Sequence, residues 1–451
     1  MHARLRTPPS RQGSRIRTVL AAALVAATAF AASALLPGQA ARAAEQRFDG
    51  QTLNVLLITS HQGAGQWLKK HFEAETGARI NPVIVPYDEI GNKLALDQQS
   101  GANTIDVAAP WYVSIGDLAD GGALLDLSDW IKGDAGLQVG DFIPSIYDPY
   151  TVFDGKRWGL PFDGDTHVLF YNKEILARNG FAQPPRTWDE YVAQARAITA
   201  KESGKGIYGN VLFGQKSPLI LGASFANRLA GYGGRFLDDA GRPVINSPQA
   251  VAAAQSLLEA AKSAYPTPAT TAFGEGNAAW YAGKAAFIEN WTDLGVGSEI
   301  GKDSKVAGKW GVVTLPVGGD QKQSRASLVA GFTWVIAHNT KKEALAKAFI
   351  KWAASSKVNE QLLSADPQTG IDPNRVSSLE SASYGKAYPD LQRVNRATLN
   401  GALAWPTGKN ATRAAEVLTD ELAKLIAGTG GTPQQTLDRV QAQWERLLRS
   451  R

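Results

Sequence analysis

Apolar residues along this chain fall into short strand-like runs that alternate with longer amphipathic stretches. Residues 53–59 (LNVLLIT) form a continuous apolar run typical of a buried strand, and residues 65–76 (GQWLKKHFEAET) have the periodicity of a helix. The same order recurs at 80–85 and 90–99. Because strands that alternate with amphipathic helices are typical of α/β architecture, the pattern predicts an α/β fold.

The second half of the chain continues this alternation. Thr187 and Glu190 form a capping-box motif at the start of an expected helix. Strands are expected at 310–315 and 328–337, and residues 410–449 read as mostly helical. With 451 residues, the chain is long enough for two domains.

The first 43 residues have the pattern of an export signal. Five arginines precede an apolar run at 19–36, and Ala41-Arg42-Ala43 offers the small residues that signal peptidase needs. We therefore expect a cleavable signal peptide at 1–43; an uncleaved membrane anchor is the alternative, since the run is nearly long enough to span a bilayer. The chain has no cysteine, so neither a lipid-anchored cysteine nor a disulfide is expected. The expected location is the periplasm.

The expected leader also changes the charge balance. It contains six of the 47 lysines and arginines and no acidic residue, which leaves 41 basic and 42 acidic residues and a net charge of −1. The computed pI of about 9.1 therefore reflects the leader. Neither nucleic acid nor an anionic membrane is expected as a partner.

Two carboxylates lie close together in the stretch GLPFDGDTHVLFYNKEIL at residues 159–176. On a strand, Asp163 and Asp165 would point to the same side with their Cα atoms roughly 6.5 Å apart. This spacing can be matched to a glycosidase pair, although such pairs usually come from different elements. A calcium loop would require glycine where Val168 stands, so the sequence excludes it.

Other kinds of catalytic or metal site lack support in the sequence. Ser224 lies in GASFA, which departs from the G-x-S-x-G nucleophile motif. The five histidines are scattered and lack metal-ligand spacing. We expect no catalytic residue, no metal and no cofactor.

Three tryptophans follow strand ends or stand in loops, where they are available to a ligand. These are Trp111, Trp291 and Trp405. Aromatic faces cover the apolar C–H side of a sugar or polyol, while carboxylates and amides pair with its hydroxyls. The pattern favours a sugar-binding role for these three side chains, with packing in the core as the alternative.

Several segments are similar to blocks of one protein family, and they occur in the family's order. The most specific is VLFYNKEILARNGFAQPPRTWDEYVAQA at 168–195; HFEAETGARI at 71–80 and IDVAAPWYVSIGDLADGGALLDLSDWI at 105–131 are further matches. The chain resembles family 1 of the extracellular solute-binding proteins of carbohydrate ABC importers, which includes the maltodextrin-binding protein. The resemblance spans nearly all of the chain beyond residue 43.

The resemblance implies a two-lobed periplasmic-binding-protein fold of class II type that closes on its ligand like a clamp. Three crossovers between the lobes are expected near Phe162–Thr166, Glu289–Trp291 and Ala330–Thr333. The expected N-terminal lobe is 44–164 plus 290–331, and the expected C-terminal lobe is 165–289 plus 332–451.

The resemblance also implies a set of ligand-binding residues. Asp165 matches a cleft carboxylate that accepts sugar hydroxyls, and His61 and Gln62 stand in a loop that often supplies polar contacts. The role of Asp163 stays open between ligand contact and bracing of the hinge. The full expected set is Asp165, Trp111, Trp291, Trp405, Asp163, His61, Gln62, Asn290, Gly331 and Phe332.

The implied function is capture of a sugar, oligosaccharide or polyol and its delivery to the permease of an ABC importer, by a protein expected to be a monomer and not an enzyme. Two alternatives remain. The same fold can bind a polyamine or another organic cation through Asp163, Asp165 and Trp111. A secreted glycoside hydrolase would use the same two acids for catalysis.

Overall fold

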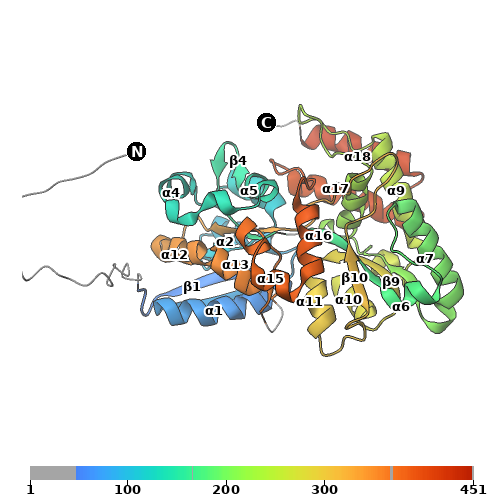
Figure 1. Cartoon of the computed structure of the whole chain (residues 1–451). Coiled ribbons are helices and arrows are strands. Elements are labelled where there is room, and N and C mark those ends of the chain that lie inside the picture. The colour runs from blue at the N-terminus through green and yellow to red at the C-terminus, as the bar shows by residue number, and fades with distance from the viewer. Residues whose placement is uncertain (1–46, 165, 366–368, 449–451) are drawn as a thin grey trace, which may run out of the picture. The chain divides into compact units, whose positions relative to one another are not determined.

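The computed structural model describes residues 47–164, 166–365 and 369–448. The expected signal peptide at 1–43 and the expected ligand residue Asp165 lie outside these residues. Within the described part, strands and helices form two sheets with helices packed against them. Figure 1 shows α1 (Gln62–Thr76) running beside β1 (Thr52–Ile58).

The first sheet has five strands in the order β2-β1-β3-β11-β6. β1 runs parallel to β2 and β3, whereas β11 is antiparallel to β3 and β6. Helices α1, α2 and α12 contact its strands. The further elements of this sheet are β2 (Arg79–Val85), β3 (Val107–Ala108), β6 (Gly159–Asp163), β11 (Phe332–Ile336), α2 (Ile90–Gln99) and α12 (Glu343–Ala353).

The second sheet has four strands in the order β10-β7-β9-β8. β7 is antiparallel to β10 and β9, and β8 is parallel to β9. Helices α6, α7, α10 and α16 contact its strands. The bounds are β7 (His167–Asn172), β8 (Tyr208–Val211), β9 (Ala285–Trp291), β10 (Trp310–Val313), α6 (Lys173–Arg178), α7 (Trp188–Glu202), α10 (Phe273–Tyr281) and α16 (Pro389–Leu399).

The remaining helices fill the connections between these strands. The capping box of Thr187 and Glu190 is confirmed at the start of α7. A short hairpin pairs β4 (Val152–Phe153) with β5 (Lys156–Arg157). The other α-helices are α3 (Ile115–Asp120), α4 (Ser128–Gly133), α5 (Pro144–Thr151), α8 (Ala223–Gly231), α9 (Pro248–Ala261), α11 (Asp293–Ile300), α13 (Ser356–Leu363), α14 (Val376–Leu379), α15 (Ala382–Ala387), α17 (Ala411–Ile426) and α18 (Pro433–Leu447). None of the helices in the described ranges combines the length and apolar character that a membrane crossing requires.

The chain passes from the first sheet to the second between β6 and β7, as the first expected crossover predicts. The passage begins at Gly164, whose amide nitrogen lies 3.4 Å from the carbonyl oxygen of Asp372. A Cβ atom at this position would stand 1.9 Å from the carbonyl oxygen of Pro373. Glycine is therefore required here because two backbone segments meet without room for a side chain.

Substitution of Gly164 by alanine should test this close approach. Because backbone atoms occupy the place of the new methyl group, we expect the free energy of unfolding to fall by about 1–3 kcal/mol. Urea denaturation measures the change. Gly140→Ala is the matched control, since no heavy atom lies within 4 Å of the Cβ position there. Equal stability of the two variants would contradict the close approach.

Two segments of the expected lobe division belong to the opposite sheet. β10 lies within 290–331, which was expected in the N-terminal lobe, yet it pairs with β7 of the second sheet. β11 opens the expected C-terminal segment 332–451, yet it lies between β3 and β6 of the first sheet. The division is wrong for these two strands. The remaining boundaries stay a proposal.

The second expected crossover, near Glu289–Trp291, is not a passage to the first sheet. From β9 the chain continues through α11 to β10, within the second sheet. It reaches the first sheet only at β11, as the crossover expected near Ala330–Thr333 predicts. Apolar strand patterns show that a strand exists, but partner choice depends on pairings between distant residues, which explains the error.

Candidate functional site

A cavity of about 390 Å³, here called the inner cavity, lies where strands of both sheets end. Ile58 closes β1, Asp163 closes β6 and Trp291 closes β9, while Phe332 opens β11. Loops beyond the strands of both sheets complete its wall. In open α/β sheets, ligands bind at such strand ends.

His61 and Asp163 form a buried pair in the wall of this cavity. The Nε2 atom of His61 lies 3.1 Å from Oδ2 of Asp163, and the two residues are 1% and 2% exposed. The other carboxylate oxygen, Oδ1, accepts a hydrogen bond of 2.7 Å from the backbone N–H of Asp372. The rings of Phe162 and Phe332 meet the imidazole edge-on, at 5.1 and 4.7 Å between centroids. The imidazole is therefore held on several sides.

This arrangement determines which nitrogen of His61 is left for a ligand. A carboxylate only accepts hydrogen bonds, so Nε2 carries the proton that it donates to Asp163. The other ring nitrogen, Nδ1, is buried and has no partner among the described residues. In neutral imidazole Nδ1 is an acceptor, which suits a hydroxyl donor.

Further hydrogen bonds, from Thr292 and through it from Asn395, hold the Asp372 side chain in place. The Thr292 hydroxyl donates to Oδ1 of Asp372. The side-chain amide of Asn395 donates to Oγ1 of Thr292 at 2.9 Å and to the Tyr384 hydroxyl at 3.1 Å. Burial raises the pKa of Tyr384, so its hydroxyl stays protonated. Asp163 is thus positioned by residues that follow it by more than 120 positions in the sequence.

Trp291 adds an aromatic side chain to the wall of the inner cavity. The residue is 8% exposed, and its ring meets His167 perpendicularly at 4.3 Å and Phe273 at 5.2 Å between centroids. Burial, followed by the nearby positive charge of Arg228, lowers the pKa of His167 to about 3, so this histidine is neutral at physiological pH. The indole Nε1 of Trp291 is buried and unpaired within the described part of the chain.

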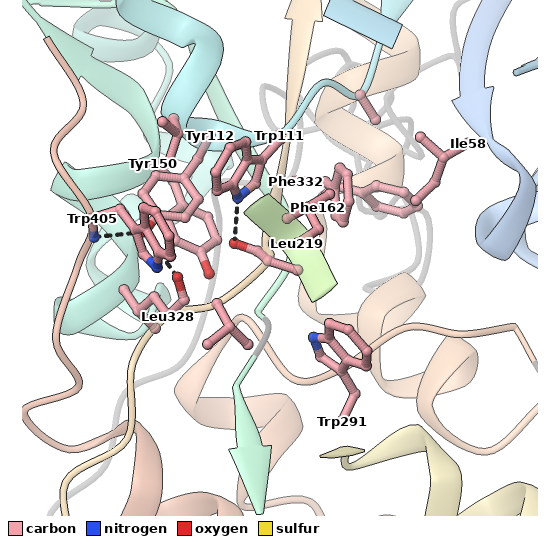
Figure 2. Close-up of a cluster of buried hydrophobic side chains, with 14 of the residues drawn as sticks. Ile58, Trp111, Tyr112, Tyr150, Phe162, Leu219, Trp291, Leu328, Phe332 and Trp405 are labelled. Carbon is pink, nitrogen blue, oxygen red and sulfur yellow. Dashed lines mark hydrogen bonds between the residues drawn. The ribbon is translucent and has the colours of Figure 1, made fainter. Parts of the chain in front are cut away.

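Trp111 and Trp405 belong to an aromatic cluster to one side of the inner cavity. Figure 2 shows them grouped with Tyr112 and Tyr150, apart from Trp291. Trp111 donates from Nε1 to the carbonyl oxygen of Ala330 at 3.2 Å. The Tyr112 hydroxyl donates to the Leu328 carbonyl and accepts from the Trp405 backbone N–H, both at 2.9 Å. Trp405 is 3% exposed and does not line the inner cavity, so packing in the core describes it better than ligand stacking.

The structure brings four of the ten expected ligand-binding residues into the wall of the inner cavity: His61, Asp163, Trp291 and Phe332. Gly331 precedes Phe332 with a φ of +91°, and a Cβ there would stand 2.0 Å from the Tyr150 hydroxyl. Glycine is therefore required at this position by its backbone conformation and by the lack of room for a side chain. Ligand contacts by these residues remain a prediction.

Asn290 and Gln62 lie elsewhere. Asn290 is fully buried, and its amide group pairs with Oδ1 of Asn277 at 2.7 Å and with the backbone N–H of Trp291 at 2.8 Å. Through these internal hydrogen bonds, Asn290 stabilises β9. Gln62 begins α1, is exposed and does not line the inner cavity.

Sequence reasoning missed several lining residues: Tyr87, Gln215, Phe273, Asp293 and Asp372. Tyr87 follows β2 just as His61 follows β1, so the argument from loops after strands was sufficient to find it. Asp372 has no such local pattern, because it reaches the site only through its contact with Asp163, 209 residues away.

Comparison with known proteins agrees with this architecture. The family model of the bacterial extracellular solute-binding proteins matches residues 59–360. The chain belongs to this family. Membership confirms the resemblance derived from the sequence blocks, and the matched range includes every strand of the two sheets except β1.

Two relatives within the solute-binding proteins illustrate the range of similarity. The chain is 32% identical over 262 residues to a probable ABC transporter-binding protein of Deinococcus radiodurans, which covers 57% of this chain and 60% of that relative. It is 25% identical over 430 residues to a probable amino-acid ABC transporter periplasmic-binding protein of Sinorhizobium fredii, which covers 91% and 93%. The chain thus spans about three fifths of the first relative.

A solved solute-binding protein has the same fold. The ABC transporter solute-binding protein of Agrobacterium radiobacter K84, in complex with ribitol, superposes with a TM-score of 0.77 at 25% sequence identity. The match covers 89% of this chain and all of that chain. This confirms the expected two-lobed α/β fold.

Proposed function

We propose that this protein is the substrate-binding component of an ABC import system and that it captures a neutral sugar or polyol in the inner cavity. The mature chain would act as a monomer in the periplasm and deliver the ligand to a membrane permease. The observation that carries this proposal is the composition of the cavity wall. Aromatic rings of Trp291, Phe273 and Phe332 stand there beside three carboxylates and one amide, and no lysine or arginine is among the described lining residues.

A sugar or polyol fits this wall for a physical reason. Its C–H faces pack on aromatic rings, while its hydroxyls both donate and accept hydrogen bonds. His61 Nδ1 and Trp291 Nε1 are both buried without a partner among the described residues. A buried polar atom without a partner costs about 1–3 kcal/mol, so a ligand that pairs with both gains affinity. Ribitol, bound by the Agrobacterium relative, belongs to this chemical class.

An amino acid is a poorer fit. Its carboxylate requires a positive partner, and the described wall of the inner cavity contains no lysine or arginine. The name of the Sinorhizobium relative therefore does not transfer to this chain on the chemistry of the cavity.

The second candidate is an organic cation such as a polyamine. It is favoured by the three aspartates in the wall, Asp163, Asp293 and Asp372. Against it, both carboxylate oxygens of Asp163 already accept hydrogen bonds from within the protein. Affinity for a cation would fall steeply with ionic strength, whereas affinity for a neutral sugar would hardly change.

We propose that the protein binds its ligand and does not catalyse a reaction on it. The hydrolase alternative needs one carboxyl group free to protonate a leaving group, but Asp163 is engaged by His61 and by the Asp372 backbone. Incubation of the protein with oligosaccharides tests this point. Turnover that disappears in Asp163→Asn would contradict the transport proposal.

A thermal-shift screen tests the ligand class directly. Ribitol, mannitol, glucose, glycine, glutamate and putrescine are added separately at millimolar concentration, and calorimetry follows each positive. We expect stabilisation by a polyol or sugar of about 2.7 kcal/mol when its concentration is 100 times Kd. Stabilisation by glutamate or putrescine alone, with none by the polyols and the sugar, would contradict the proposal.

A further inference from the structure

A second hollow adjoins the inner cavity. This outer groove, of about 350 Å³, is lined by residues that include Trp111, Asp117 and Glu416. It shares two lining residues with the inner cavity, Tyr87 and Leu219. The two spaces are therefore neighbours that share a wall formed by Tyr87 and Leu219.

A hydrogen bond closes that wall. The Tyr87 hydroxyl donates to Oε1 of Gln215 at 3.0 Å. Tyr87 lies in the loop after β2 of the first sheet, whereas Gln215 follows β8 of the second sheet. The contact thus joins loops from different sheets, at the place where the inner cavity and the outer groove meet. It also spans 128 positions of sequence, so no local turn requires it.

The outer groove has the chemistry of a further sugar position. Trp111 lines it, held in place by the hydrogen bond from Nε1 to the Ala330 carbonyl. Polar groups stand around it. Asp117 accepts hydrogen bonds from the backbone N–H groups of Asn410 and Thr412, at 2.6 and 3.1 Å, which anchors the first turn of α17 at this wall.

We propose that Tyr87 and Gln215 form a gate that restricts the protein to compact ligands by separating the inner cavity from the outer groove. This inference rests on the proposed function, because it concerns the length of the sugar or polyol. An inner cavity of about 390 Å³ stands near the lower end of the range for ligand pockets. An oligosaccharide has to extend beyond it, and Tyr87 lines both the inner cavity and the outer groove next to it.

The gate acts through two separable properties of Tyr87. The hydroxyl ties the two loops together, and the ring fills the opening. Tyr87→Phe removes the hydrogen bond and keeps the ring, whereas Tyr87→Ala removes both. Gln215→Ala removes the partner alone, and Gln183→Ala is its matched control, because Gln183 is exposed and lies outside both hollows.

The experiment compares affinities for short and long ligands by calorimetry. Compact probes are ribitol, mannitol and glucose, and long probes are maltotriose, chitotriose and xylotriose. For each variant, the measured quantity is the best affinity for a long probe divided by the best affinity for a compact one. We expect this ratio to rise at least tenfold in Tyr87→Ala, to rise less in Tyr87→Phe and Gln215→Ala, and to stay at the wild-type value in Gln183→Ala.

Two failures of this experiment are distinct. A Tyr87→Ala variant that binds a compact probe with the wild-type ratio overturns the gate, as does a wild-type protein that already prefers the trisaccharides. A folded wild-type protein that binds none of the six probes overturns the proposed function instead. Circular dichroism of each variant establishes that it is folded.

Discussion

Replacing Trp291 with alanine should weaken binding of the sugar or polyol about 30- to 100-fold, which corresponds to about 2–3 kcal/mol. Trp291 closes β9, and its ring is fixed by His167 at 4.3 Å and by Phe273 at 5.2 Å. Because burial lowers the pKa of His167 to about 3, we expect no change in the charge of His167 to disturb this contact in the physiological range. The preorganised aromatic face and the unpaired Nε1 are lost together in the alanine variant.

Trp291→Phe separates these two contributions. Phenylalanine keeps an aromatic face and loses the N–H donor, so we expect an affinity between those of the wild type and Trp291→Ala. Trp310→Phe is the matched control, because Trp310 begins β10 of the same sheet and donates from Nε1 to Glu299 at 2.9 Å, away from the inner cavity. Calorimetry with the ligand from the screen measures all three. Wild-type affinity in Trp291→Ala would remove Trp291 from the site.

The contacts of Asp163 bear on the two roles that the sequence leaves open, ligand contact and bracing of the hinge. One of its oxygens faces His61 and the other accepts from the Asp372 backbone. We therefore propose that Asp163 braces the crossover and orients His61, whose Nδ1 meets the ligand. A polar residue beside a glycine in a crossover strand is compatible with either role, so the sequence alone was insufficient.

The sequence predicted the strand ends of the site better than its supporting contacts. Trp291 closes an apolar run, so the strand pattern located it, whereas the family resemblance located His61 in the loop after the first strand. Asp372 has no such pattern, and its place depends on pairing with Asp163 across 209 residues. The prediction of which sheet contains β10 and β11 was wrong for the same reason. Each is a short apolar run that is compatible with either sheet, and only pairing with distant residues determines which sheet it joins.

Arg228→Met should lower the free energy of unfolding by about 3–5 kcal/mol at neutral pH. Arg228 and Glu289 are buried and form two parallel hydrogen bonds of 2.7 and 2.9 Å, and the guanidinium lies 4.4 Å from the ring of Trp188. Without the guanidinium, the Glu289 carboxylate is left buried and uncompensated. Glu289 stands two residues before Trp291 on β9, so this pair also fixes the strand that presents the aromatic wall.

The loss should depend on pH in a defined direction. Burial raises the pKa of Glu289 even in the presence of Arg228, and removal of the positive charge raises that pKa further. A folded-state pKa above the unfolded one favours folding at low pH, and this contribution is lost as the pH rises through the folded-state value. Arg228→Met should therefore be less destabilised at pH 5 than at pH 8, as measured by urea denaturation.

Two further variants distinguish the effect of breaking the buried pair on stability from the general effect of replacing an arginine. Arg196→Met breaks the exposed pair with Glu259 and should cost only about 0–1 kcal/mol. Arg228→Met combined with Glu289→Leu removes both charges and should recover most of the stability, because no uncompensated carboxylate remains. If the double variant is as unstable as Arg228→Met, the loss comes from packing of Arg228 on Trp188 and not from an unpaired charge at Glu289.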